Sequence, residues 1–209
     1  MAAPYLTLED VIEHETEIKR SRFICAIAPV ASEEAAREFL AERRRLYGDA
    51  THNCSAYVIG GDRPAQKADD DGEPGGTAGI PMLETLLRRG LGDVVAVVTR
   101  YYGGVKLGAG GLVRAYGSAV GKTLDLAELV AMVPARIVSV TVDHLRAGRL
   151  ENDLRVSPYE VREVVYGAEV GFRVAVRETD LAGFLDWVAT LTAGRAILET
   201  GETVYLGET

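Results

Sequence analysis

An almost wholly apolar, β-branched segment at residues 94–99 constrains the fold of this chain more than any other feature. Its valines predict a strand that is buried on both faces, and we expect that strand to lie at the centre of a sheet. A glycine-rich turn follows it, and residues 112–129 then carry apolar side chains along one helical stripe. Because strand and helix must share a core, the segment predicts a mixed α+β fold.

The rest of the first half predicts further elements of both kinds. We expect extended structure over the first 30 residues and a helix that begins after the N-cap Ser32. A strand at 55–59 follows, and then a long loop at 62–79. A short helix has Pro81 in its first turn.

The second half predicts a separate domain. Residues 133–135 (Val-Pro-Ala) are typical of a linker, so we place one α+β domain at residues 1–133 and another at 136–209. The pattern of the second domain is strand, helix, two strands, helix and strand. This order, βαββαβ, is that of the ferredoxin-like split motif.

Charge is distributed unevenly along the chain. The 209 residues carry a formal charge of −8, which argues against tight, non-specific binding of nucleic acid by the whole surface. Residues 80–122 nevertheless hold six basic and two acidic side chains and form the only positive segment. No apolar run is long enough to span a membrane, and the N-terminus lacks the basic start of a signal peptide. We therefore expect a cytoplasmic protein with no membrane partner.

An acidic, glycine-rich stretch at residues 69–79 is the first candidate site. Asp70, Asp71 and Glu73 are candidate ligands for Mg²⁺, since hard cations prefer clustered oxygen atoms. Their spacing is not that of an EF-hand loop, and a solvated acidic turn is the alternative. Gly76 and Thr77 stand just before a helix, where free backbone amides can bind an anion or simply permit a tight turn.

A second glycine-rich stretch follows the apolar strand and opens a helix. Such a junction can hold phosphate on unpaired helix amides, and Tyr101 could stack on a base or pack in the core. The candidate ligand-binding or nucleic-acid-binding residues here are Arg100, Tyr101, Gly103, Gly104, Lys106, Gly110, Gly111 and Arg114. The sequence GSAVGKT at 117–123 has the wrong glycine spacing for a Walker loop and lies inside the predicted helix, so we reject it as a P-loop.

His52 and Cys54 are the candidate catalytic residues. Two positions apart in a strand, their side chains would share one face. A Cys–His pair can generate a thiolate nucleophile. The alternative is a structural pair, because a free cysteine is frequently just buried.

Several blocks of this sequence, in order, resemble the YigZ/IMPACT family. They lie at residues 52–57, 70–74, 76–81, 98–101, 103–108 and 110–116, and the match spans about residues 19–116. The second half resembles the bacterial YigZ branch. The resemblance implies an N-terminal domain similar to the second domain of a small-subunit ribosomal protein. It also implies a C-terminal domain similar to the last domain of elongation factor G. Tyr102 departs from the phenylalanine that is usual there, and Gly75 from the common serine.

The resemblance also carries a functional expectation. Eukaryotic members are implied to regulate translation initiation under amino-acid starvation, through a kinase pathway that bacteria lack. We therefore expect a non-enzymatic protein linked to regulation of translation, with RNA, the ribosome or a translation-related protein as partner and no cofactor. The alternative is an enzyme acting on a small phosphorylated ligand, with Mg²⁺ at the acidic and glycine-rich loops. The sequence leaves the oligomeric state open.

Overall fold

The computed structural model describes residues 2–61 and 64–208, which form two compact units at residues 4–131 and 132–208. The described part holds two five-stranded sheets and five α-helices, a mixed fold of the class predicted from the sequence. None of its helices has both the length and the apolar character needed to cross a membrane. Each unit has a core of its own and is described by itself.

The first unit is built on an antiparallel sheet in the order β2-β3-β6-β4-β5. These strands are β2 (Ile12–Ile18), β3 (Ser21–Pro29), β6 (Val94–Tyr101), β4 (His52–Ile59) and β5 (Ala65–Asp69). The central place of β6 is confirmed, and its side chains are buried on both faces from Val94 to Arg100. Its register with β4 sets His52 opposite Arg100 at one end of the sheet.

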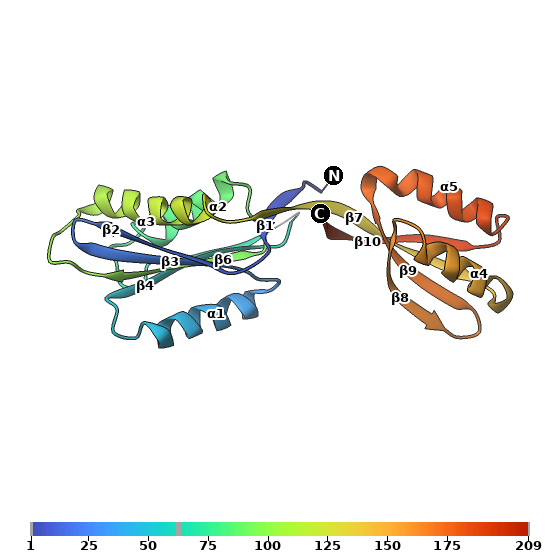
Figure 1. Cartoon of the computed structure of the whole chain (residues 1–209), viewed down its shortest axis with the longest axis horizontal. Coiled ribbons are helices and arrows are strands. Elements are labelled where there is room, and N and C mark those ends of the chain that lie inside the picture. The colour runs from blue at the N-terminus through green and yellow to red at the C-terminus, as the bar shows by residue number, and fades with distance from the viewer. Residues whose placement is uncertain (1, 62–63, 209) are drawn as a thin grey trace. The chain divides into compact units, whose positions relative to one another are not determined.

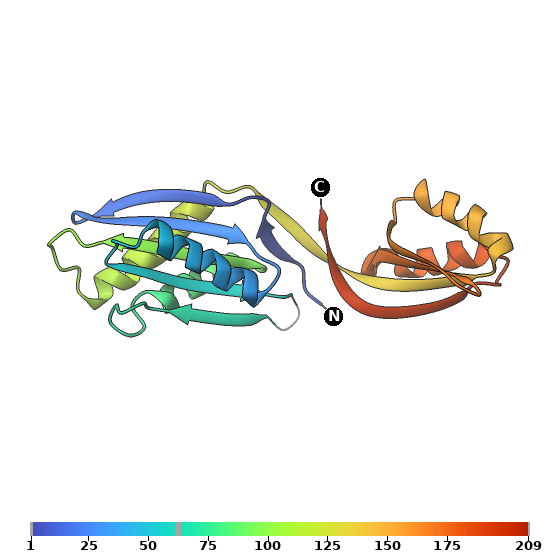
Figure 2. The ribbon, with the colours of Figure 1, turned by 90° about the horizontal axis from the view of Figure 1, so that it is seen from below.

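Helices cover both faces of this sheet (Figures 1 and 2). Helix α1 (Glu33–Leu46) packs on one face, where Tyr57, Val95 and Val97 are buried against it. Helices α2 (Gly79–Arg88) and α3 (Ala109–Leu124) pack on the other, over the larger core cluster. The predicted N-cap of α1 is confirmed, because the Ser32 hydroxyl accepts a hydrogen bond from the amide of Ala35.

The second unit has the predicted βαββαβ order. Its elements are β7 (Leu129–Val142), α4 (His144–Arg155), β8 (Glu160–Tyr166), β9 (Val170–Arg177), the short 3₁₀ helix η1 (Glu178–Asp180), α5 (Leu181–Leu191) and β10 (Ile197–Glu208). The strands of this unit lie in the order β10-β7-β9-β8. Strand β1 (Tyr5–Leu8) belongs to the first unit. The core between the sheet and the helices includes Leu150, Phe172 and Phe184.

Three local predictions were wrong. Residues 133–135 are no linker: β7 runs through them without a break, and Ala135 is buried opposite Arg177 of β9. The two compact units divide between residues 131 and 132, within β7. Strand β5 occupies part of the predicted loop at 62–79, of which residues 62 and 63 lie outside the described residues. Helix α3 begins at Ala109 and ends at Leu124, because the chain from Leu129 onward pairs as β7.

Candidate functional site

The chain brings His52, the acidic loop and the end of β6 together at one end of the first sheet. His52 begins β4, and the loop from Asp70 to Ala78 connects β5 to α2. A Cβ atom built on Gly72 would lie 3.6 Å from the His52 ring, so the loop returns directly over this strand. Three of the predicted site segments are thus neighbours in space.

Glu73 is the centre of this cluster. Its Oε1 accepts hydrogen bonds from Nη1 of Arg100 at 2.6 Å and from the hydroxyl of Tyr116 at 2.7 Å. Its Oε2 lies 3.8 Å from Nε2 of His52. The Glu73 and Arg100 side chains are only 3% and 6% exposed, so the carboxylate and the guanidinium form a buried ion pair. The positive charge of Arg100, which was predicted to bind a ligand, is therefore paired with a carboxylate inside the protein.

Cys54 lies within the same cluster as a protonated thiol. Its Sγ is 3.0 Å from the carbonyl oxygen of Asp70 and 3.4 Å from the hydroxyl of Tyr116. Burial raises the pKa of Cys54 to about 12, and burial likewise raises the pKa of Tyr116. A thiol with such a pKa is not a nucleophile at neutral pH.

The His52 ring does not activate that thiol. Its Nδ1 lies 2.8 Å from the carbonyl oxygen of Asp71, which can only accept, so Nδ1 carries a proton. Its Nε2 is directed at Glu73. The geometry therefore argues against the Cys–His nucleophile and favours the structural alternative for His52 and Cys54.

The amides of the first glycine loop are occupied by the chain itself. The Asp70 carboxylate accepts hydrogen bonds from the backbone N–H groups of Gly76, Ala78 and Gly79 at 2.7–2.9 Å. Burial alone would raise the pKa of Asp70, but these three bonds outweigh it and hold the pKa below its usual value. Thr77 is also used internally, since its hydroxyl donates to the carbonyl of Pro74 at 2.6 Å. The Asp70 carboxylate thus occupies the backbone amides that were predicted to bind an external anion.

The three predicted Mg²⁺ ligands point to separate partners. Asp70 faces the loop amides and Glu73 faces Arg100. Asp71 accepts from the amide of Asn53 at 2.6 Å and pairs with Arg44 at 2.7 Å. Across residues 2–61 and 64–208, no three His, Cys, Asp or Glu side chains gather in a way that could hold a metal ion. The residues of this loop do not fit a bound Mg²⁺.

The second glycine loop, between β6 and α3, crosses the β2–β3 turn at very close range. A Cβ atom on Gly103 would lie 2.0 Å from the carbonyl oxygen of Arg20, so only glycine fits there. The Gly103 amide donates to the hydroxyl of Ser21 at 3.2 Å. Tyr101 is tied down as well, with its hydroxyl donating to Asp49 at 2.7 Å. Gly103 and Tyr101 therefore anchor the loop.

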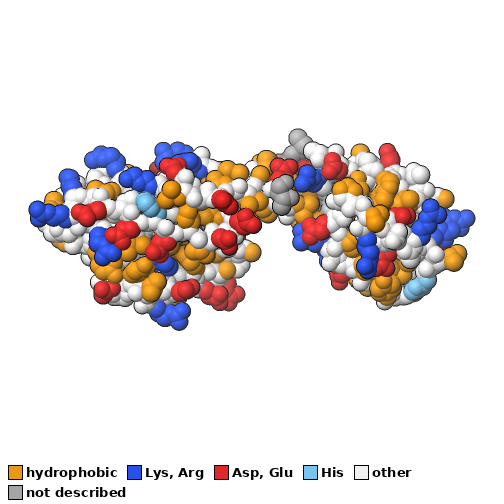
Figure 3. Space-filling view, in the orientation of Figure 1, with side chains coloured by type: hydrophobic (Ala, Val, Ile, Leu, Met, Phe, Trp, Pro, Cys, Tyr) orange, Lys and Arg blue, Asp and Glu red, His pale blue; other side chains and the backbone are white. Residues whose placement is uncertain are grey.

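The remainder of this loop and the first turns of α3 face solvent. We call this region the α3 N-terminal surface and define it by the exposed residues Tyr102, Val105, Lys106 and Arg114 and by the glycines at 104, 108, 110 and 111. Nη1 of Arg114 would lie 3.6 Å from a Cβ on Gly110, so the guanidinium lies over the first turn of the helix. Gly108, the N-cap, supplies no side chain to the helix amides. Figure 3 shows basic side chains gathered on this side of the first unit, over α2, α3 and the loop before α3.

Tyr116 is the residue of the cluster that sequence reasoning missed. It lies on the apolar stripe of α3, so the pattern assigns it to the core, and it is indeed fully buried against Phe23. The available signal was its hydroxyl, because a buried tyrosine needs a hydrogen-bond partner. The acidic loop supplies that partner through Glu73.

Comparison with known proteins identifies the family. The Impact N-terminal domain matches residues 19–124, and the Domain of unknown function (DUF1949) matches residues 140–195. The IMPACT family member YvyE of Bacillus subtilis is 46% identical over 206 residues, which cover 99% of this chain and 95% of that protein. The chain belongs to the IMPACT family. The family resemblance predicted from the sequence is thereby confirmed.

Two further matches extend over nearly the whole IMPACT chain. The IMPACT family member YigZ of Escherichia coli is 37% identical over 195 residues, which cover 92% of each protein. A crystal structure described as that of a hypothetical protein has a TM-score of 0.76 and 35% identity. That match covers 95% of this chain and 98% of the other. Both units of the fold are thus shared with relatives.

Proposed function

We propose that this IMPACT family protein is a non-enzymatic, cytoplasmic protein linked to regulation of translation, and that it binds ribosomal RNA through the α3 N-terminal surface. One contrast within the first unit supports this. The acidic and nucleophilic groups of the buried cluster form hydrogen bonds and an ion pair within the protein, and these contacts hold the acidic loop and the β2–β3 turn in place. The basic and aromatic groups beside the glycines of α3 are left to solvent.

The charges of the positive segment support a phosphate-binding surface. Arg88, Lys106, Arg114 and Lys122 are exposed, and none of them forms an ion pair with another described residue. Because the rest of the chain carries the excess of negative charge, contact with RNA would be local and strongly dependent on salt.

Two further features of the surface suit RNA. Tyr102 is 46% exposed, and the Arg100 guanidinium lies over its ring at 5.5 Å from the centroid, so an unpaired base would stack on the exposed part of the ring. The start of α3 has no side-chain cap, and the Gly111 amide already donates to the Gly108 carbonyl at 3.0 Å, so the amides of Ala109 and Gly110 are the ones that a phosphate would reach. The link to translation rests on the family and on the expected similarity of both domains to ribosome-associated folds, which is an argument by analogy.

The alternative, an enzyme that uses Mg²⁺ and a phosphorylated ligand, gains no support from the cluster. The loop amides are bound by Asp70, and Glu73 is bound by Arg100. A phosphorylated substrate would have to displace both carboxylates from their partners.

The proposal is tested by co-sedimentation of the intact protein with ribosomes and with purified ribosomal RNA between about 50 and 200 mM salt. Lys106→Gln with Arg114→Gln removes two charges from the surface. The matched control, Arg37→Gln with Arg45→Gln, removes two exposed charges from α1 on the opposite face of the sheet. We expect the surface variant to reduce the slope of log affinity against log salt by about 1 per side chain, and the control to leave it unchanged.

Two results would overturn the proposal. One is an intact protein that fails to sediment with ribosomes or RNA at the lowest salt. The other is a surface variant whose affinity and slope equal those of the α1 control.

A further inference from the structure

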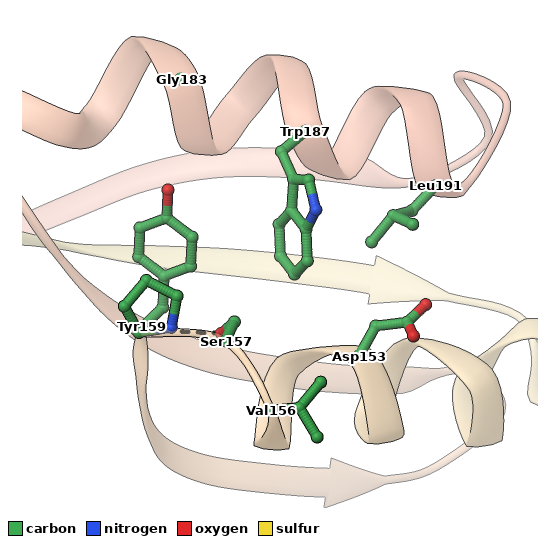
Figure 4. A pocket seen from close by; sticks show the side chains of 8 residues that line it. Asp153, Val156, Ser157, Tyr159, Gly183, Trp187 and Leu191 are labelled. Atoms are coloured by element: carbon green, nitrogen blue, oxygen red, sulfur yellow. Dashed lines mark hydrogen bonds between the residues drawn. The ribbon is translucent and has the colours of Figure 1, made fainter.

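The second unit contains a cavity of about 540 Å³ between the C-terminal end of α4 and α5 (Figure 4). Its volume falls within the range of small-molecule sites, roughly 300–1,000 Å³. Val156 and Asp153 line it from the α4 side, Tyr159 from the segment before β8, and Trp187 and Leu191 from α5. No residue of this cavity belongs to the site of the first unit.

Two aromatic rings form the main walls. The Trp187 and Tyr159 ring centroids are 5.7 Å apart, and both rings pack on the buried Phe184, at 6.0 and 4.7 Å. Phe184 therefore fixes their positions. Gly183 adds no side chain to the wall, and a Cβ there would meet nothing within 4 Å. Val156, at 79% exposed, leaves apolar surface open at the mouth.

One end of the cavity carries a negative charge. Asp153 is the one carboxylate among the lining residues, and in Figure 4 it points from α4 toward the space beside Leu191 and Trp187. Its ion-pair partner is Arg149, with 3.8 Å between Nε and Oδ2, and the Arg149 side chain is 79% exposed. This distance is too long for a hydrogen bond, so the carboxylate remains open to a better-placed cation.

We propose that this cavity binds a small organic cation that has an aromatic or alkyl body and one ammonium group. The body lies against the Trp187 and Tyr159 rings, and the ammonium group lies beside Asp153. The aromatic rings offer apolar and ring-stacking contact to the body, and the carboxylate adds a charge-assisted hydrogen bond to the ammonium group. A neutral ligand gains only the apolar contact, and an anion is repelled. The proposal does not depend on RNA binding by the first unit.

The chain supplies its own reporter, because Trp187 is its only tryptophan. We would titrate the full-length protein with phenethylammonium and follow tryptophan fluorescence. 2-Phenylethanol, which has nearly the same shape without the charge, and phenylacetate, which is an anion, serve as matched probes. We expect a saturable change with phenethylammonium at a concentration about tenfold below that needed for the alcohol, and none with phenylacetate.

Variants separate the charge from the shape. Asp153→Asn keeps the volume and should weaken phenethylammonium binding about tenfold while leaving the alcohol unchanged. Asp186→Asn, an exposed position on α5 outside the cavity, is the control and should change neither. Arg149→Gln removes the competing cation and should tighten phenethylammonium binding. Wild-type binding of the cation should also weaken with added salt, which tests the charge even where a variant fails to fold.

The proposal is overturned by equal affinity for the ammonium and the alcohol, by an Asp153→Asn protein that binds phenethylammonium as the wild type does, or by the absence of any saturable change.

Discussion

The Glu73 carboxylate and the Arg100 guanidinium meet at 2.6 Å in the interior of the first unit, and they join the loop after β5 to the end of the central strand β6. Tyr116 adds a bond from α3 to the same carboxylate oxygen. One oxygen atom thus fixes a loop, a strand and a helix to one another. Because the pair joins these three elements, its removal should lower the free energy of unfolding of the first unit.

Replacing Glu73 by Gln should destabilise the first unit by about 3–5 kcal/mol, because the Arg100 charge then stays buried without a counter-charge. Urea unfolding followed by far-UV circular dichroism measures the change, while fluorescence of Trp187 monitors the second unit and should not shift. Glu15→Gln, which breaks an exposed pair with Arg22, is the control and should have little effect. Glu73→Met with Arg100→Met should recover most of the loss. Equal effects of Glu73→Gln and Glu15→Gln would contradict the structural role.

Asp70 should make the stability of the first unit depend on pH in the acid range. Its pKa is held below the usual value, since the three amide bonds outweigh the opposing effect of burial, so the ionised form favours the folded state. This contribution is fully present above the unfolded pKa of about 4 and disappears as the pH falls through the lower folded pKa. Asp70→Asn should therefore be less stable than the wild type by about 1–3 kcal/mol at pH 7. The difference should shrink toward zero near pH 2. A difference that is the same at both pH values would refute this account.

Both cysteines should resist alkylation in the folded protein. Burial raises the pKa values of Cys25 and Cys54 to about 12, so thiolate is scarce and the sulfur atoms are covered. We expect iodoacetamide at pH 7.5 to leave both unmodified in native protein and to label both in urea, as read by mass spectrometry. A cysteine placed at the exposed Ser118 of α3 should react at the rate of a free thiol. Rapid labelling of native Cys54 would reopen its assignment as a nucleophile.

Gly103→Ala should destabilise the first unit, because the new Cβ would lie 2.0 Å from the Arg20 carbonyl oxygen and one of the two loops must move. We expect a loss of about 1–3 kcal/mol in urea unfolding, as for other overpacked positions. Gly75→Ala is the matched control: its Cβ meets nothing within 4 Å, so its stability should be unchanged or slightly higher. A Gly103→Ala protein as stable as the Gly75→Ala protein would disprove the close approach.

The fold could be predicted where local pattern and tertiary environment agree. Strand β6 is apolar on both faces and lies between two strands, and α1 begins at a serine that caps it. The linker prediction at 133–135 failed because it rested on Pro134, a residue that is typical of chain breaks but says nothing about pairing with distant strands. Strand β7 nevertheless runs through this proline, and its pairing with β9, some 40 residues later in the chain, begins directly after it at Ala135.

The site could be predicted only in part. The sequence pattern placed His52, Glu73 and Arg100 in three separate candidate motifs, for catalysis, Mg²⁺ binding and ligand binding. In the structure these side chains lie beside one another instead. Whether a backbone amide or a guanidinium is free to bind a ligand depends on which carboxylates lie next to it in the folded protein. Asp70 and Glu73 occupy such groups, and both belong to an irregular loop whose path cannot be predicted from a helical or strand pattern.

The Asp70 carboxylate affects how tightly a partner can bind the first glycine loop. Because it holds the amides of Gly76, Ala78 and Gly79 in the free protein, the loop is preorganised before association. A partner that contacts the exposed backbone at Gly75 and Gly76 would not lose affinity to the conformational entropy of ordering that segment.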